Sequence, residues 1–156
     1  MICREATAAD LSAIDRLFRQ SFRDTFAHLY RPGDLKAFLS KFTPGAWADE
    51  FNNPDYRFRV AEVDGDIVGY LKLGPSTLPV ETSAHAIELR QLYILKEYHG
   101  VGIAHALTDW AIDQARALGA GELYLTVYTD NHRAKRFYHR YGFEAVGRYD
   151  FMVGQQ

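Results

Sequence analysis

Three small residues at alternate positions follow an apolar run late in the chain. Gly100, Gly102 and Ala104 begin four residues after the stretch AIELRQLYIL, where the sequence period changes from that of a strand to that of a helix. The first amides of a helix have no internal acceptor, and the helix dipole favours an anion at that end. Small side chains let a bulky anion reach those amides. The spacing therefore predicts a phosphate or pyrophosphate site, with helix–sheet packing through small residues as the ordinary alternative.

Two familiar phosphate motifs do not fit this stretch. A dinucleotide fingerprint needs a third small residue where His105 stands, and an acidic residue at the end of the next strand, whereas Glu122 opens that strand. A Walker loop needs Lys and Ser or Thr where Ile103 and Ala104 stand. Another phosphate-bearing cofactor remains.

Cysteine and metal chemistry find little support. Cys3 is the only cysteine, so it forms no internal disulfide, and its place in an expected first strand favours a core residue over a nucleophile. The six histidines include no His-Glu-x-x-His pair and no companion cysteine pair. We expect no metal site.

The bulk composition points to one ordinary domain over residues 1–156. The chain is 47% hydrophobic and 24% charged, and its net charge of −2 gives no electrostatic argument for nucleic acid or an anionic membrane. No apolar stretch approaches the ~18 residues that span a bilayer. The N-terminal MICREATAAD lacks the pattern of a signal peptide, so a cytoplasmic protein is the expectation.

The first half of the chain changes from helical to alternating periodicity. Thr7 and Asp10 have the spacing of a capping box at the start of a helix that follows a short first strand. Two further short helices are expected in RPGDLKAFLSKF and PGAWADEFNNPD. The stretches YRFRVAEV and IVGYLKLG then alternate around a turn at Asp64, Gly65 and Asp66, which predicts a β-hairpin.

The second half alternates strands and helices. We expect a strand over 86–95, a helix from Gly100 to Leu118, a strand over 122–128, a helix over 130–141, and one or two strands within 143–153. This order predicts an α+β or α/β domain with a central sheet.

Two motifs together resemble those of the GCN5-related N-acetyltransferases. The family signature Gln/Arg-x-x-Gly-x-Gly/Ala falls on His99, Gly102 and Ala104, with His99 in place of Gln or Arg. A second recurrent pattern matches residues downstream, namely Asn131, Ala134, Phe137, Tyr138, Gly142 and Phe143. The N-terminal half, with SFRDTFAHLY and FNNPDYRFRV, is similar to the PaiA-type spermidine/spermine acetyltransferases.

The resemblance implies a fold and a reaction. The fold is a single α+β (α/β-like) domain whose mixed, mostly antiparallel sheet has six to seven strands, is flanked by helices and splays at its central strands. The reaction is direct attack of a primary amine on acetyl-CoA, without an acyl-enzyme. The residues implied in cofactor binding are Leu92, Tyr93, Ile94, His99, Gly100, Val101, Gly102, Ile103, Ala104, His105, Asn131 and Tyr138.

The same resemblance assigns two catalytic roles. Tyr138 would be the general acid, since a phenol with a pKa near ~10 is protonated at neutral pH; packing onto the sheet is its ordinary alternative. Glu88 would be the base, directly or through a water, with a solvated charge or a partner for Arg90 as its alternative. A regular strand would place Glu88 and Leu92 on one face, and a bulge would change that.

The acceptor site is expected between the first helices and the hairpin. Its expected walls are Phe22, Thr25, Phe26 and Tyr30, and the carboxylates available to a polyamine are Asp24, Asp34, Asp49 and Glu50. A small amine is the expected substrate, with polyamines first. The alternatives are a protein N-terminus or lysine as acceptor, and a non-catalytic acyl-CoA-binding module. The resemblance also allows a homodimer.

Overall fold

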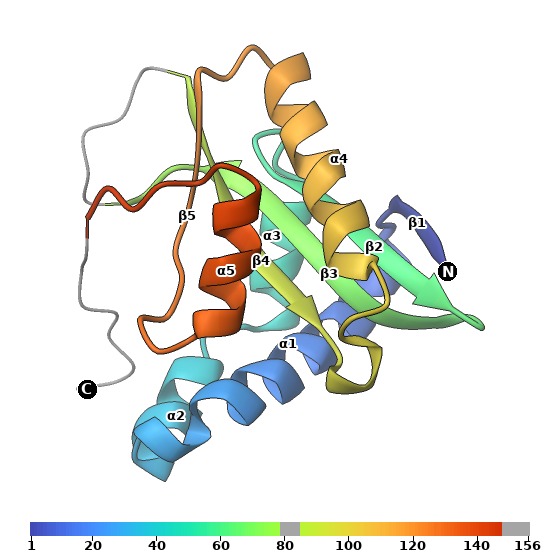
Figure 1. The fold of residues 1–156 in the computed structure, drawn as a ribbon. Coiled ribbons are helices and arrows are strands. Elements are labelled where there is room, and N and C mark those ends of the chain that lie inside the picture. The colour runs from blue at the N-terminus through green and yellow to red at the C-terminus, as the bar shows by residue number, and fades with distance from the viewer. Residues whose placement is uncertain (79–84, 148–156) are drawn as a thin grey trace.

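The computed structural model describes residues 1–78 and 85–147, and in them one five-stranded sheet is flanked by helices (Figure 1). The strands lie in chain order, with β1 to β4 antiparallel to their neighbours and β5 parallel to β4. They are β1 (Ile2–Glu5), β2 (Arg57–Val63), β3 (Asp66–Pro75), β4 (Ala86–Ile94) and β5 (Glu122–Leu125). The helices are α1 (Leu11–Phe26), α2 (Pro32–Leu39), α3 (Pro44–Phe51), α4 (Ile103–Ala117) and α5 (His132–Arg140).

The predicted α+β class is confirmed, and the strand count is lower than expected. The strand predicted over 122–128 ends at Leu125. Beyond that residue β4 diverges, and the chain no longer pairs with it. The described part of the predicted final strands, 143–147, contains no strand, and the rest of that prediction lies outside the described residues.

The N-terminal cap and the hairpin form as predicted. The Asp10 carboxylate accepts the backbone N–H of Thr7 at 2.7 Å, which is one half of a capping box. In the hairpin, Val63 pairs with Asp66 across a two-residue turn. Asp64 and Gly65 both have positive φ, 51° and 84°, as the tight turn that matches strand twist requires.

Helices cover the two faces of the sheet separately (Figure 1). One face packs against α1, α2 and α3 through a cluster that includes Phe18, Trp47 and Tyr70. The other packs against α4 through a cluster that includes Leu71 and Leu107, and Tyr138 of α5 packs against it. Burial of these apolar side chains is the main favourable term that holds the layers together.

The sheet opens between β4 and β5. The two strands pair only from Ala86 with Glu122 to Leu89 with Leu125, whereas β4 runs on to Ile94. A bulge lies at the point of divergence, because Lys72 pairs with Gln91 and Leu73 with Leu89, which leaves Arg90 as the extra residue. The predicted splay of the sheet is therefore present.

Candidate active site

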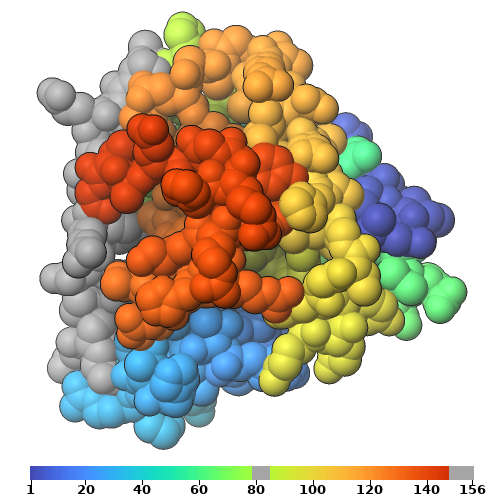
Figure 2. All heavy atoms as spheres, in the orientation of Figure 1, coloured from blue at the N-terminus to red at the C-terminus, as the bar shows by residue number. Residues whose placement is uncertain are grey.

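A cleft of about 1310 Å³ occupies the opening between the two strands. In Figure 2 the surface is hollowed between red-orange α5 and the yellow segment that follows β4, with blue α1 below. Ligand pockets usually measure ~300–1000 Å³, so this cleft has room for more than one small ligand. It is lined from both faces of the sheet, by α1 and α2 on one side and by α5 on the other.

The glycine-rich loop lies at the start of α4 beside this cleft. Gly100 and Gly102 have φ values of 80° and 93°, and a Cβ at either position would meet only open space. The N–H of Ala106 bonds to the carbonyl of Gly102 at 3.1 Å, so the amides of 103–105 precede the first intrahelical bond. An exposed turn with two glycines and unpaired amides fits a diphosphate, and the Val101 side chain between the glycines is itself 60% exposed.

Two residues of this segment use their side chains elsewhere. Ile103 is 1% exposed and packs in the core on the α4 face, so only its backbone faces the loop. The ring of His105 packs against Phe137 with centroids 4.9 Å apart, and its Nδ1 lies 3.0 Å from the Tyr141 hydroxyl. These two residues can therefore contribute to the predicted cofactor site only through their backbone amides.

His99 fixes the geometry at the mouth of the loop. Its Nε2 lies 2.9 Å from the carbonyl oxygen of Ile94, and its Nδ1 lies 2.7 Å from Nη1 of Arg133. A guanidinium can only donate, so Nδ1 accepts and Nε2 carries the proton. Arg133 is a cation that the sequence reasoning gave no role, because no sequence spacing relates it to a residue 34 positions earlier.

The predicted cofactor strand borders the cleft along its unpaired side. Leu92, Tyr93 and Ile94 all line it. Leu92 and Ile94 pack toward α4, whereas the Tyr93 ring lies 5.6 Å from that of Phe18 on the α1 face. Burial raises the pKa of Tyr93 to about 12. Beyond Leu89 the backbone of β4 makes no ladder with β5, which leaves groups that an extended ligand can pair with.

Tyr138 reaches the cleft from α5. Its ring is half-buried, and the rings of Phe137 and Phe143 lie 5.2 and 5.6 Å away. Burial raises the pKa of Tyr138 above the ordinary value, and the nearby Tyr93 adds to the effect. The phenol therefore stays protonated at neutral pH, as a proton donor must.

Asn131 begins α5 and also lines the cleft. Its Oδ1 accepts the N–H of Ala134 at 3.1 Å, so Asn131 caps the helix in addition to its expected contact with the cofactor. The two roles are compatible, because the amide nitrogen is left for a second partner.

Glu88 lies on the face of β4 opposite to Leu92. Leu92 pairs with Leu71 of β3, and Glu88 pairs with Gly74. Because Leu71 and Gly74 are three residues apart, they lie on opposite faces of β3, and so do the residues paired with them. Of the two arrangements considered for these residues, the bulged strand is the one present, with Arg90 as the extra residue. Glu88 thus faces the side covered by α1 to α3, where an acceptor would enter.

Glu88 is 6% exposed, and hydrogen bonds and an ion pair hold its carboxylate in place. Its Oε1 accepts the N–H of Thr77 at 3.1 Å and lies 3.7 Å from Nη1 of Arg90. The partnership with Arg90 that was its ordinary alternative is therefore real. It orients the carboxylate without removing it from the cleft, which Glu88 and Arg90 both line.

All four expected acceptor-wall residues line the cleft: Phe22, Thr25, Phe26 and Tyr30. Of the four carboxylates considered, Asp24 and Glu50 line it. Asp34 instead pairs with Arg31 at 3.2 Å, and neither Asp34 nor Asp49 lines the cleft.

Lys72 is a buried cation in this part of the cleft that the sequence reasoning overlooked. It is 3% exposed, and its Nζ lies 2.8 Å from Oε1 of Glu50 and 5.3 Å from the Trp47 ring centroid. Burial lowers the pKa of Lys72, and Glu50 opposes that shift. The alternation of β3 places Lys72 inward, but a lone lysine in a strand gives no signal of its partner.

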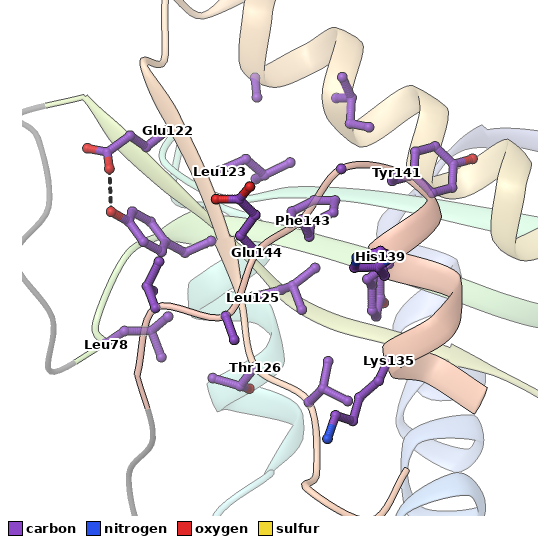
Figure 3. A pocket seen from close by; sticks show the side chains of 18 of the residues that line it. Leu78, Glu122, Leu123, Leu125, Thr126, Lys135, His139, Tyr141, Phe143 and Glu144 are labelled. Carbon is purple, nitrogen blue, oxygen red and sulfur yellow. Dashed lines mark hydrogen bonds between the residues drawn. The ribbon is translucent and has the colours of Figure 1, made fainter. Parts of the chain in front are cut away.

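A second hollow adjoins the cleft, between β5, α5 and residues 143–147 (Figure 3). It shares Leu125 and Tyr138 with the cleft, and in it the Tyr124 hydroxyl donates to the Glu122 carboxylate. None of the residues predicted for the acceptor lies here. We therefore place the chemistry in the first cleft.

Other chemistries find no support in 1–78 and 85–147. These residues contain no group of three or more His, Cys, Asp or Glu side chains that could hold a metal ion. Cys3 is half-buried against the core on the α4 face, and burial raises the pKa of its thiol. In the same ranges no helix is both long and apolar enough to cross a membrane.

Comparisons with known proteins agree with this arrangement. The model of the acetyltransferase (GNAT) family matches residues 14–143. An uncharacterized N-acetyltransferase of Mycobacterium tuberculosis is 32% identical over 124 residues, 79% of this chain and 76% of that protein. Another, from the pepI 3′ region of Lactobacillus delbrueckii subsp. lactis, is 28% identical over 152 residues, 96% of this chain and 88% of that protein.

The fold is shared with a solved structure that contains the expected ligand. The PaiA N-acetyltransferase of Thermoplasma acidophilum in complex with coenzyme A superposes with a TM-score of 0.76 at 24% identity, over 92% of this chain and 89% of that one. With the family model covering most of the sequence, the chain belongs to the GNAT family of acetyltransferases.

Proposed function

We propose that this acetyl-CoA-dependent N-acetyltransferase acetylates the primary amine of a small molecule within the cleft between β4 and β5. The observation that carries the proposal is the approach of two groups from opposite faces of the sheet. Tyr138 enters from the α4 face and Glu88 from the α1 face, and both line the same cleft. Acetyl-CoA supplies the activated acetyl thioester.

Different groups of the chain would bind the cofactor and transfer the protons at successive positions along the cleft. The amides at Gly100–Ala104 would hold the diphosphate. The edge of β4 that faces β5, over residues 90–93, has no strand partner there and would pair with the pantetheine amides. Tyr138 would donate a proton to the departing sulfur. Glu88 would accept the proton that the ammonium must lose before its nitrogen can attack, either directly or through a water.

A polyamine is the first acceptor to assay. The resemblance to PaiA-type enzymes is what suggests it. Fold alone does not fix the acceptor, since one fold carries many specificities. Peptides with free N-termini or lysines form the contrasting class.

Calorimetry followed by a thiol-release assay tests the proposal. We expect coenzyme A to bind, and acetyl-CoA to release thiol when at least one small primary amine is present. Binding without thiol release from any amine would leave a non-catalytic acyl-CoA-binding module. Release with peptides and not with small amines would move the enzyme to the protein-acetylating class.

A further inference from the structure

The acceptor end of the cleft is walled by aromatic rings from several separate segments. We name as the aromatic wall Phe22, Phe26, Tyr30, Phe38, Phe42 and Tyr128, all of which line the cleft. Phe22 and Phe26 lie on α1, and Phe38 lies on α2, with Tyr30 between the two helices and Tyr128 beyond β5. All but Phe22 are half-buried, so part of each ring remains accessible.

The rings of this wall are arranged for contact with one another and with a flat guest. Phe22 stacks on Phe38 with centroids 4.9 Å apart and an interplanar angle of 23°. Phe26 meets Tyr128 edge to face at 5.5 Å. Both geometries are favourable for aromatic pairs, and an additional ring in the cleft could adopt either.

Acidic and basic side chains of the described residues are equal in number along the cleft. Among the described residues its lining contains three carboxylates, of Asp24, Glu50 and Glu88, and three cations, of Lys72, Arg90 and Lys96. A polyamine brings several positive charges, each of which needs an uncompensated acceptor when it leaves water. A balanced cleft disfavours such a guest.

The carboxylates are also individually engaged. Oε1 of Glu50 lies 2.8 Å from Nζ of Lys72, and Glu88 lies 3.7 Å from Arg90. The third carboxylate, of Asp24, accepts the neutral side-chain amide of Gln20 at 3.1 Å, and Asp24 is exposed at the rim. Within 1–78 and 85–147, the cleft interior thus offers no carboxylate without a cationic partner.

We infer that the acceptor is a small monoamine whose body is an aromatic ring, held by the aromatic wall with its single ammonium directed toward Glu88. This inference rests on the proposed function and narrows its substrate class. The transfer balances simply: the nitrogen–carbon bond of the amide forms as the carbon–sulfur bond breaks. The ammonium gives one proton to Glu88 or water before its nitrogen attacks. A second proton leaves that nitrogen as the amide forms, and it replaces the proton that Tyr138 gives to the thiolate.

An acceptor panel tests the inference on the intact enzyme with acetyl-CoA. The probes are 2-phenylethylamine and tyramine, n-hexylamine as a ring-free amine of similar length, and putrescine and spermidine as polycations. We expect kcat/KM for the two aromatic amines to exceed that of either polyamine at least tenfold, and that of n-hexylamine about threefold or more. A polyamine or n-hexylamine that equals the aromatic amines overturns the inference while the proposed function stands. Failure of every amine overturns the proposed function itself.

Two variants with a control link the selectivity to the wall and to the charges. Phe26→Leu keeps most of the volume but removes the ring, so kcat/KM for 2-phenylethylamine should fall about threefold to tenfold with coenzyme A affinity unchanged. The neighbouring Leu29→Ala, which does not line the cleft, is the control and should change neither. Lys72→Met removes the cation that is paired with Glu50, which leaves this carboxylate for an ammonium group of the substrate. The kcat/KM for spermidine should therefore rise. An unchanged ring preference in the first variant, or an unchanged spermidine rate in the last, would contradict the inference.

Discussion

Tyr138 combines position and protonation state, the two properties that a proton donor needs. It lines the cleft from α5, and burial keeps its pKa above the ordinary value of a phenol. We expect Tyr138→Phe to lower kcat by about 10²–10⁴-fold while the Kd for coenzyme A changes little. Tyr141→Phe is the matched control, because Tyr141 directly follows α5 and its hydroxyl donates to Asp109 at 2.8 Å outside the cleft. Near-normal turnover by the Tyr138 variant would remove the acid role.

The raised pKa of Tyr138 also predicts a pH profile. The phenol is the active species when protonated, and a higher pKa extends that state to higher pH. Turnover of the wild type should therefore show no loss of the acid below pH ~10, the ordinary pKa of tyrosine. The measurement is kcat against pH with saturating substrates, and a decline near neutral pH that Tyr138→Phe abolishes would contradict this assignment.

Glu88 is the residue proposed to accept the proton that the ammonium of the substrate loses. Glu88→Gln preserves the shape and the hydrogen bond from Thr77 but removes the capacity to accept a proton. We expect kcat/KM for the amine to fall about 10²-fold. Exposed Glu97→Gln is the control. An unaltered rate would mean that Glu88 only orients Arg90.

At the scale of elements, the side chain of the bulge residue Arg90 packs closely over Gly74 of β3. A Cβ on Gly74 would lie 2.6 Å from Cδ of Arg90 and 2.8 Å from Cε1 of Tyr56, which is too close for either side chain to stay in place. Gly74→Ala should therefore displace Arg90 from Glu88 and cost about 1–3 kcal/mol of stability. Chemical denaturation measures the stability.

The kinetic consequence of that substitution separates strain from function. We expect the folded Gly74→Ala enzyme to lose kcat/KM for the amine and to keep its affinity for coenzyme A. Gly33→Ala is the control, because a Cβ there meets nothing within 4 Å. Equal behaviour of the two variants would show that the contact with Arg90 is dispensable.

Patterns local in sequence predicted the helices and strands well. They did not predict features that depend on how one strand pairs with another. The hairpin at Asp64–Gly65 and the loop at Gly100–Gly102 were predictable because their backbone angles require particular residues. The bulge at Arg90 was not predictable, because the periodicity of one strand does not show its register with the neighbouring strand. For the same reason the face on which Glu88 lies, and hence its neighbours, needed the structure.

The candidate site divides in the same way. The motifs identified the cofactor side because that side uses backbone groups at fixed spacing. The acceptor side brings together Phe38, Lys72 and Tyr128, which are scattered along the sequence and resemble ordinary core residues until the fold unites them. His99 and Arg133 are a further case, joined only by the approach of α5 to the end of β4.

At the scale of the whole molecule, one ion pair joins the first strand to the first helix. Arg4 of β1 contacts both oxygens of Asp10, at 2.8 and 3.0 Å, beside the start of α1. The hydrogen bond from Arg4 is the main cause that lowers the pKa of Asp10 to about 2. Because the folded pKa is below the unfolded value, this stabilisation is complete above pH ~4 and is lost as pH falls toward 2.

Acid unfolding measures that contribution. Asp10→Asn should lower the free energy of unfolding at pH 7 by about 1–2 kcal/mol, allowing for the part-exposed Arg4, and should flatten the loss of stability between pH ~4 and ~2. Exposed Asp49→Asn is the control. Equal pH dependence in Asp10→Asn and the wild type would mean that the pair contributes nothing to stability.

The account as a whole depends on where coenzyme A binds, and a crystal structure of the complex tests that most directly. We predict diphosphate oxygens within ~3.2 Å of the amide nitrogens of the 101–104 turn, and the pantetheine arm extended along β4 beyond the bulge. A complex with the diphosphate bound at any other part of the surface, and this turn covered by side chains, would contradict it.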